Sequence, residues 1–174
     1  MGIKNWEPTS QNLSNVGLSL VLGGREVSLL QEATAYAVFA NKGEQKDPVS
    51  ILKVTDSKGK TLYEYKDTDG KKVLDPGIAF IISDILADNG ARLVDFGFDN
   101  QLKIGKKYVS AKTGTTNDFR DNWTFGYTPN YVVGVWVGNN DNSAMNGLAS
   151  GITGAAPIWN DLMSHMLEKQ NPVR

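Results

Sequence analysis

Residues 106–138 read KKYVSAKTGTTNDFRDNWTFGYTPNYVVGVWVG and contain the strongest structural signal in the chain. Runs of apolar and β-branched residues predict strands at about residues 106–115, 122–127 and 131–138. The short connection at residues 128–130, Thr-Pro-Asn, joins the second strand to the third as an antiparallel hairpin. The third strand is apolar on both faces, which predicts a central strand covered on both sides. We therefore expect an antiparallel three-strand meander.

Helices are expected before and after these strands. A capping box formed by Ser28 and Gln31 begins a helix that runs to about Asn41. A second helix begins where Asp75, an N-cap residue, is followed by proline. A last helix covers about residues 155–168.

Two further short strands, at about residues 51–55 and 61–65, flank a turn at residues 56–59 and predict a small hairpin. The fold class is therefore α+β, an antiparallel sheet packed with helices. No repeat, low-complexity tract or linker divides the chain, so residues 1–174 are expected to belong to one domain.

Composition excludes several kinds of function. The formal net charge is −1, whereas a surface that tracks phosphates would be strongly basic, so nucleic acid is not an expected partner. There is no cysteine, which excludes disulfides and thiolate metal sites. The single histidine, His165, excludes a site with several histidine ligands and is interpreted as a surface residue. We therefore expect no metal and no cofactor.

The candidate binding site is the run Lys112-Thr113-Gly114-Thr115-Thr116 at the end of the first strand of the meander. An ammonium group and neighbouring hydroxyls suit a carboxylate ligand, and a glycine lets a substrate backbone come close. A simpler reading remains open, in which the lysine is a solvated strand end and the threonines are ordinary strand residues. K-T-G is a signature of penicillin-recognising active-site serine enzymes, but three residues alone are a weak match.

The surroundings of this motif make the match specific. Residues 112–140 read KTGTTNDFRDNWTFGYTPNYVVGVWVGNN, residues 151–163 read GITGAAPIWNDLM, and residues 18–43 read LSLVLGGREVSLLQEATAYAVFANKG. In this order the blocks resemble the C-terminal half of the transpeptidase domain of class A penicillin-binding proteins. The resemblance implies a partial β-lactamase/transpeptidase-like fold. It also implies a parent protein that cross-links peptidoglycan at the extracytoplasmic face of the bacterial membrane.

The resemblance implies roles for the motif residues. Lys112 would face the catalytic serine and the terminal carboxylate of a D-Ala-D-Ala stem peptide or a β-lactam. The hydroxyls of Thr113 and Thr115 would bind that carboxylate, and the backbone N–H of Thr115 would form half of the oxyanion hole. Gly114 would leave room for the ligand, and Thr116 completes the expected substrate-binding set.

The nucleophile of the family is not evident. Its serine lies in S-x-x-K on a helix, where the lysine shares a face with the serine. The two matches here begin at Ser50, in a strand pattern, and at Ser57, in a turn, and both are interpreted as accidental. Ser10-Gln11-Asn12 matches the second motif, S-x-N, only as a short string. We therefore expect a chain that retains the third motif, with the nucleophile in a missing N-terminal half, and that is inactive alone.

Two alternatives stay open: a non-catalytic binding or sensor module, and a D,D-carboxypeptidase or β-lactamase type of hydrolase. Asp118, Arg120 and Asp121 are interpreted as a charged, solvated loop. The larger rings are interpreted as core aromatics, namely Trp123, Phe125, Trp136 and Trp159.

The missing half would normally cover part of the sheet. Without it we expect Val109, Ala111, Phe125 and Val135 to lose their cover. An apolar face of that size would favour self-association or instability.

Overall fold

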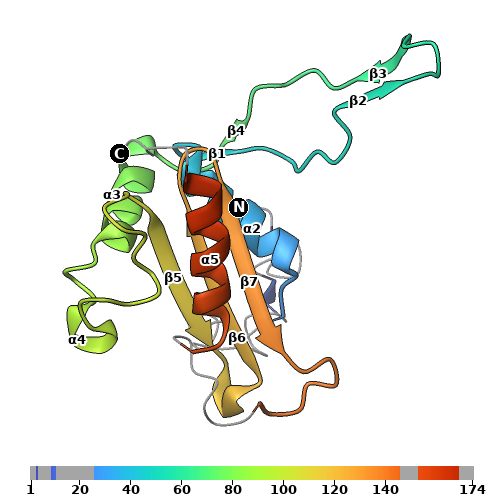
Figure 1. The fold of residues 1–174 in the computed structure, drawn as a ribbon. Coiled ribbons are helices and arrows are strands. Elements are labelled where there is room, and N and C mark those ends of the chain that lie inside the picture. The colour runs from blue at the N-terminus through green and yellow to red at the C-terminus, as the bar shows by residue number, and fades with distance from the viewer. Residues whose placement is uncertain (1–2, 4–8, 11–25, 146–152, 169–174) are drawn as a thin grey trace.

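A three-stranded antiparallel sheet, in the order β5-β6-β7, forms the centre of the computed structural model (Figure 1). The structure describes residues 3, 9–10, 26–145 and 153–168. The strands are β5 (Ser110–Thr115), β6 (Asp121–Tyr127) and β7 (Val132–Gly138). The 3-10 helix η3 (Asn117–Phe119) connects β5 to β6. The antiparallel meander is therefore confirmed, although its first strand begins later than predicted.

The strand order corrects one prediction. The central strand is β6, and β7 lies at the edge of the sheet that the structure describes. Its two-sided apolar pattern has another cause, because helices α2 (Leu29–Ala40) and α5 (Ala155–Leu167) contact β7 from opposite faces of the sheet (Figure 1). Helix cover on two faces produces the same sequence pattern as a central position in the sheet.

Helix α5 supplies much of the core. Its side chains Trp159, Met163 and Leu167 are fully buried against the sheet. Gly126 of β6 makes room for the indole ring, since a Cβ atom at this position would lie 2.2 Å from Trp159 Cζ2. The predicted final helix is therefore confirmed, and it packs on one face of the meander.

Helix α2 covers the opposite face with aromatic rings. Tyr36 stacks on Phe125 with ring centroids 5.0 Å apart, and Phe39 stacks on Tyr127 at 6.2 Å. The predicted capping box is present, because the Gln31 N–H donates to Ser28 Oγ and the Ser28 N–H donates to Gln31 Oε1.

Helix α3 (Pro76–Ala87) is tied to the sheet by polar side chains. Asp75 caps it by accepting the Gly77 N–H at 2.8 Å, as predicted. Ser110 Oγ donates to the Ser83 carbonyl at 2.7 Å, and Ser83 Oγ lies 2.9 Å from Tyr127 Oη. The short helix α4 (Leu93–Phe96) follows in the connection to β5.

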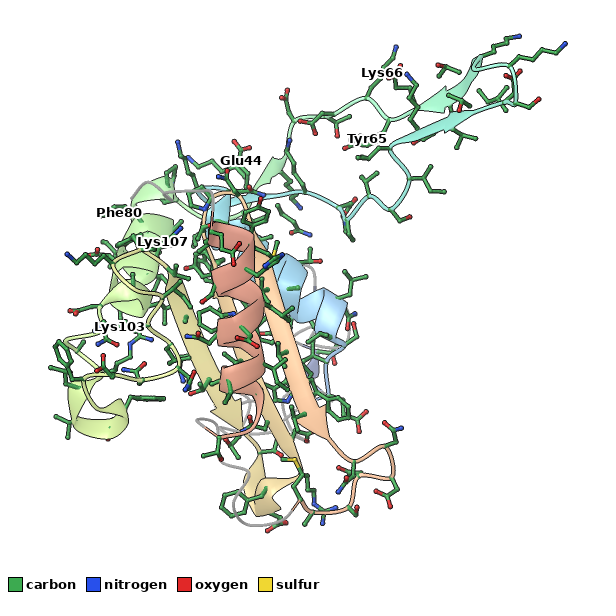
Figure 2. All side chains as sticks on the ribbon, in the orientation of Figure 1. Glu44, Tyr65, Lys66, Phe80, Lys103 and Lys107 are labelled. Carbon is green, nitrogen blue, oxygen red and sulfur yellow. The ribbon has the colours of Figure 1, made fainter. Side chains whose placement is uncertain are left out.

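The hairpin predicted near residues 51–65 is confirmed and stands out from the body (Figure 1). Strands β2 (Lys53–Thr55) and β3 (Thr61–Glu64) form it, and β1 (Glu44–Gln45) pairs with β4 (Lys71–Lys72) at its base. We call residues 46–70 the arm. Figure 2 shows its side chains, Tyr65 and Lys66 among them, far from the sheet.

The prediction that four apolar residues of the sheet lose their cover is wrong. Val109, Ala111, Phe125 and Val135 are all buried, because α2 and α5 of the same chain cover the sheet. Exposed apolar side chains lie elsewhere, among them several on the arm and on α3, where Ile78, Ile81 and Ile85 are 51%, 57% and 60% exposed.

Candidate functional site: the end of strand β5

The K-T-G-T run lies on β5, where the burial pattern changes. Ser110 and Ala111 are buried, whereas Lys112, Gly114 and Thr115 are exposed. Strand β5 pairs with β6 on one side, and no other strand of the described residues pairs with its outer edge. An edge strand presents unpaired backbone groups along its length. The run is therefore accessible both to a ligand backbone and to a ligand charge.

The side chain of Lys112 lies at the surface, and its Nζ donates to the Thr113 carbonyl at 2.7 Å. Side chains alternate along a strand, so Lys112 and Gly114 share one face while Thr113 and Thr115 share the other. A Cβ at Gly114 would meet only Trp123 Cβ, at the ordinary contact distance of 3.8 Å. Gly114 therefore leaves open surface beside the ammonium group.

Asn122, which faces Thr115 across the two strands, is a site residue that sequence reasoning missed. Its side chain is fully buried, and its Nδ2 donates to Thr115 Oγ1 at 3.2 Å. Its Oδ1 accepts the Ala155 N–H at 2.6 Å, at the beginning of α5. Asn122 thus joins the K-T-G-T strand to the N-terminus of the helix that fills the core.

The prediction that Asp121 is a solvated loop residue is wrong. Asp121 Oδ2 accepts from Thr116 Oγ1 at 3.0 Å, and Oδ1 accepts from Trp136 Nε1 at 2.8 Å. The Asp121 N–H also donates to Thr116 Oγ1 at 2.8 Å. The hydroxyl of Thr116 is therefore engaged in the turn that ends the motif. No sequence signal indicates these contacts, because Trp136 lies on another strand.

The other two charges of this loop are at the surface, as expected. Asp118 and Arg120 form a loose ion pair, with Arg120 Nε 3.9 Å from Asp118 Oδ2. Arg120 Nη1 also donates to the carbonyl of Asn142 at 2.5 Å. Of the four predicted core aromatics, Trp159 and Phe125 are fully buried, and Trp123 and Trp136 are partly buried.

A small pocket of about 160 Å³ lies beside the motif, between α3, α4 and β5. Lys112 and Thr113 line it together with Arg92, Phe96 and Leu102, among others. Burial lowers the pKa of Arg92, while the nearby Asp88 charge acts in the opposite direction.

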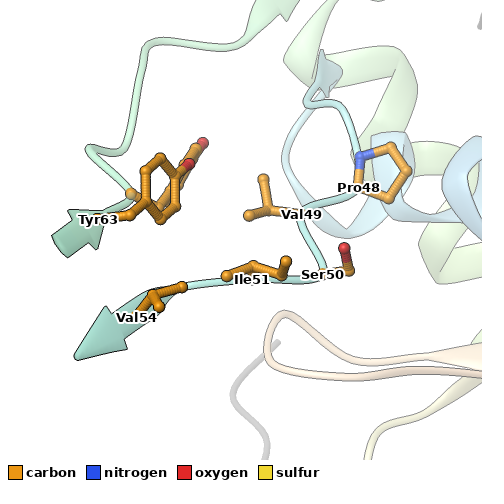
Figure 3. Close-up of a pocket in the computed structure, with 7 residues that line it drawn as sticks. Pro48, Val49, Ser50, Ile51, Val54 and Tyr63 are labelled. Atoms are coloured by element: carbon orange, nitrogen blue, oxygen red, sulfur yellow. The ribbon is translucent and has the colours of Figure 1, made fainter. Parts of the chain in front are cut away.

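The two S-x-x-K matches have no catalytic geometry. Ser50 precedes β2 and lines an open apolar pocket of about 480 Å³ on the arm, with Ile51, Val54 and Tyr63 (Figure 3). Lys53 instead pairs with Glu64 across the hairpin, at 3.3 Å.

The second match lies in the turn at the tip of the arm. Both Ser57 and Lys60 are exposed there. Of the S-x-N string, Ser10 is exposed, and Gln11 and Asn12 lie outside the described residues.

Within the described ranges, no cluster of three or more His, Cys, Asp or Glu side chains could hold a metal ion. His165 lies at the surface near Glu168, with 82% of its side chain exposed. None of the helices described is long and apolar enough to cross a membrane.

Residues 2–164 match the sequence profile of the penicillin binding protein transpeptidase domain. The chain belongs to this family. Penicillin-binding protein 1A of Clostridium botulinum is 40% identical over 131 residues, which cover 75% of this chain and 15% of that protein. Penicillin-binding protein 1A of Aquifex aeolicus is 37% identical over 145 residues, which cover 83% of this chain and 19% of that protein. The chain thus spans less than a quarter of these two relatives.

Solved structures of the family share the fold. Penicillin-binding protein 1A of Haemophilus influenzae superimposes with a TM-score of 0.77 and 27% identity, over 90% of this chain and 28% of that one. PonA1 of Mycobacterium tuberculosis superimposes with a TM-score of 0.77 and 24% identity, over 99% of this chain and 48% of that one. The resemblance to class A penicillin-binding proteins and the partial transpeptidase fold are therefore confirmed.

Proposed function

We propose that this chain supplies the substrate-carboxylate and oxyanion part of a serine-type D,D-transpeptidase that cross-links peptidoglycan stem peptides. The observation that carries the proposal is the run Lys112-Thr113-Gly114-Thr115 at the open edge of β5, in which Lys112, Gly114 and Thr115 are exposed and Thr113 is half-buried. Family membership provides its chemical context. The ligands are a stem peptide that ends in D-Ala-D-Ala and β-lactams, both of which carry a carboxylate.

In this mechanism Lys112 holds the terminal carboxylate by charge, while the hydroxyls of Thr113 and Thr115 orient it. The backbone N–H of Thr115 stabilises the oxyanion that forms when a serine attacks the penultimate D-Ala carbonyl. The terminal D-Ala then leaves, and an amine of a neighbouring stem peptide attacks the acyl-enzyme. Thr116 contributes by fixing the strand end through Asp121, because its hydroxyl already donates to that carboxylate.

The nucleophilic serine comes from a part of the protein outside the described residues. Among the candidates that can be assessed, Ser50 and Ser57 have no lysine one helical turn away, because each lies outside a helix. The isoleucines exposed on α3, Ile78, Ile81 and Ile85, suit the docking of that part, which would remove this apolar stripe from water. The parent protein would act at the extracytoplasmic face of the bacterial membrane.

Replacement of one lysine tests the proposal. In the full-length protein, Lys112→Ala should slow acylation by a fluorescent penicillin roughly 100-fold or more, by analogy with the loss of a preorganised oxyanion donor. Lys58→Ala is the matched control, because Lys58 is an exposed lysine at the tip of the arm. Acylation at the normal rate in Lys112→Ala would show that the end of β5 is not part of the site.

The isolated chain provides a second test of the proposal. It should form no covalent adduct with the same penicillin. Stoichiometric labelling that disappears on mutation of Ser10, Ser50 or Ser57 would show that the nucleophile lies within this chain. In the full-length protein, transfer of the acyl group to water in place of an amine acceptor would identify a hydrolase.

A further inference from the structure

Arg92 makes an unusual set of contacts next to the proposed site. It lies between α3 and α4, and its guanidinium donates to three backbone carbonyls. Nη2 donates to the carbonyl of Leu86 and Nε to that of Asp88, at 3.3 Å. Nη1 donates to the carbonyl of Ala111, at 3.4 Å, and Ala111 is the residue before Lys112.

Two of these contacts anchor the side chain. Leu86 and Asp88 lie at the C-terminal end of α3, where the last helical carbonyls have no partner within the helix. A cation is favoured there by the helix dipole as well as by hydrogen bonds. The loop itself is ordered by Asp88, whose Oδ1 accepts the N–H groups of Gly90 and Ala91. These two contacts fix the position of the guanidinium group, which also contacts β5.

The third contact acts on the motif. The Ala111 carbonyl belongs to the peptide group that joins Ala111 to Lys112, so its orientation influences the orientation of Lys112. On its inner side β5 is held by β6, where Ala111 faces Gly126. At Ala111 the outer edge is held by the guanidinium. The planar guanidinium group of arginine donates to several acceptors in one fixed geometry, whereas the ammonium group of lysine does not.

We propose that Arg92 is a positioning residue, which couples the C-terminal end of α3 to the K-T-G-T strand and sets the orientation of Lys112. The inference rests on the proposed function, since it concerns the same site. Arg92 itself needs no contact with the ligand. Its loss should therefore slow the acylation step more than it weakens the noncovalent penicillin complex, because a displaced Lys112 still carries its charge near the ligand carboxylate.

The test measures the acylation rate constant and the noncovalent dissociation constant separately, in the full-length protein. Arg92→Met keeps the apolar stem and removes the fork, and Arg92→Lys keeps the charge. Both should lower the acylation rate constant roughly 10-fold or more, because small displacements of catalytic groups cost up to about 100-fold. Adding guanidinium ion at millimolar concentration should restore part of the rate in Arg92→Ala.

Ser83→Ala is the matched control for loss of stability. It removes the contact of Ser83 Oγ with Tyr127, which also holds α3 against the sheet. Among the described residues the Ser83 hydroxyl bonds only to Tyr127 Oη and the Ala79 carbonyl, neither of which belongs to the K-T-G-T run. This variant should acylate at the normal rate.

An equal loss of rate in Ser83→Ala and Arg92→Met would mean that Arg92 only stabilises the fold, and would overturn the proposal. Full activity of Arg92→Lys would overturn it too, because charge alone would then suffice. Should Arg92→Met fail to fold, Arg92→Lys and the guanidinium experiment still test the proposal.

The Lys112 variant separates this inference from the proposed function. Normal acylation in Lys112→Ala would refute the proposed function itself. A defect in Lys112→Ala together with normal acylation in the Arg92 variants would refute only this inference.

Discussion

The sheet and the arm use similar residue types with opposite results. In the sheet and its helices, Trp159, Met163 and Leu167 have no exposed surface. In the arm, Leu52 and Leu62 are 66% and 62% exposed. The arm is a single hairpin without a covering helix, and a two-stranded hairpin alone is marginally stable in water. The comparison teaches that the sheet can hold a reacting group in place, whereas the arm has apolar surface but no rigid support.

The largest effect is expected in the core of the sheet. Trp159→Ala should lower the free energy of unfolding by about 3–5 kcal/mol, because a fully buried ring is lost and a cavity remains against Gly126. Urea unfolding followed by circular dichroism measures the change. The control is Ile158→Ala on the same helix, where the side chain is 49% exposed and the loss should be much smaller. A loss below about 1 kcal/mol in Trp159→Ala would show that α5 is not packed as described.

A smaller loss is expected for the buried polar link of the sheet. Asn122→Ala should lower the free energy of unfolding by about 1–3 kcal/mol, because the Ala155 N–H loses its acceptor and Thr115 Oγ1 loses its donor. Asn130→Ala, at an exposed position in the β6–β7 turn, is the control. If the two substitutions cost the same in urea unfolding, the link between β6 and α5 contributes nothing to stability.

A partly buried glutamate on α2 should make the stability of the protein depend on pH. Burial on α2 raises the pKa of Glu32 in the folded state, so its ionised form is disfavoured there relative to the unfolded chain. Its contribution to stability is therefore complete below the unfolded pKa and is lost as the pH rises through the folded one. Glu32→Gln should stabilise the protein at pH 7, and the gain should vanish near pH 4, about the ordinary pKa of glutamate.

Glu64→Gln is the comparison in the arm, where the carboxylate is exposed and pairs with Lys53. Thermal unfolding at both pH values measures the difference. A gain for Glu32→Gln that is the same at pH 4 as at pH 7 would mean that the charge of Glu32 is not its cause.

The smallest effect is expected at the tip of the arm. Leu62→Ser should change the free energy of unfolding by no more than about 0.5 kcal/mol, because the side chain is already 62% exposed. The same urea titration provides the measurement. A loss above about 1 kcal/mol would show that the arm packs against another surface in solution, and the contrast with the sheet would disappear.

The sequence by itself determined the elements whose signals are local. The Ser28 capping box, the Asp75 cap, both hairpins and the final helix are read from residues within a few positions of one another. The K-T-G-T run was found in the same way, as a motif at the end of a strand. Such features depend on backbone preferences and short-range hydrogen bonds, which the local sequence carries.

Only the tertiary structure decided that β7 is an edge strand with helices α2 and α5 on its two faces, and which apolar residues stay exposed. It also decided the contacts of Asn122 with Ala155 and of Arg92 with Ala111. Each of these contacts joins residues that are distant in the chain. Periodicity describes the neighbours of a residue along one element, so it cannot indicate which other element will supply a buried donor or acceptor.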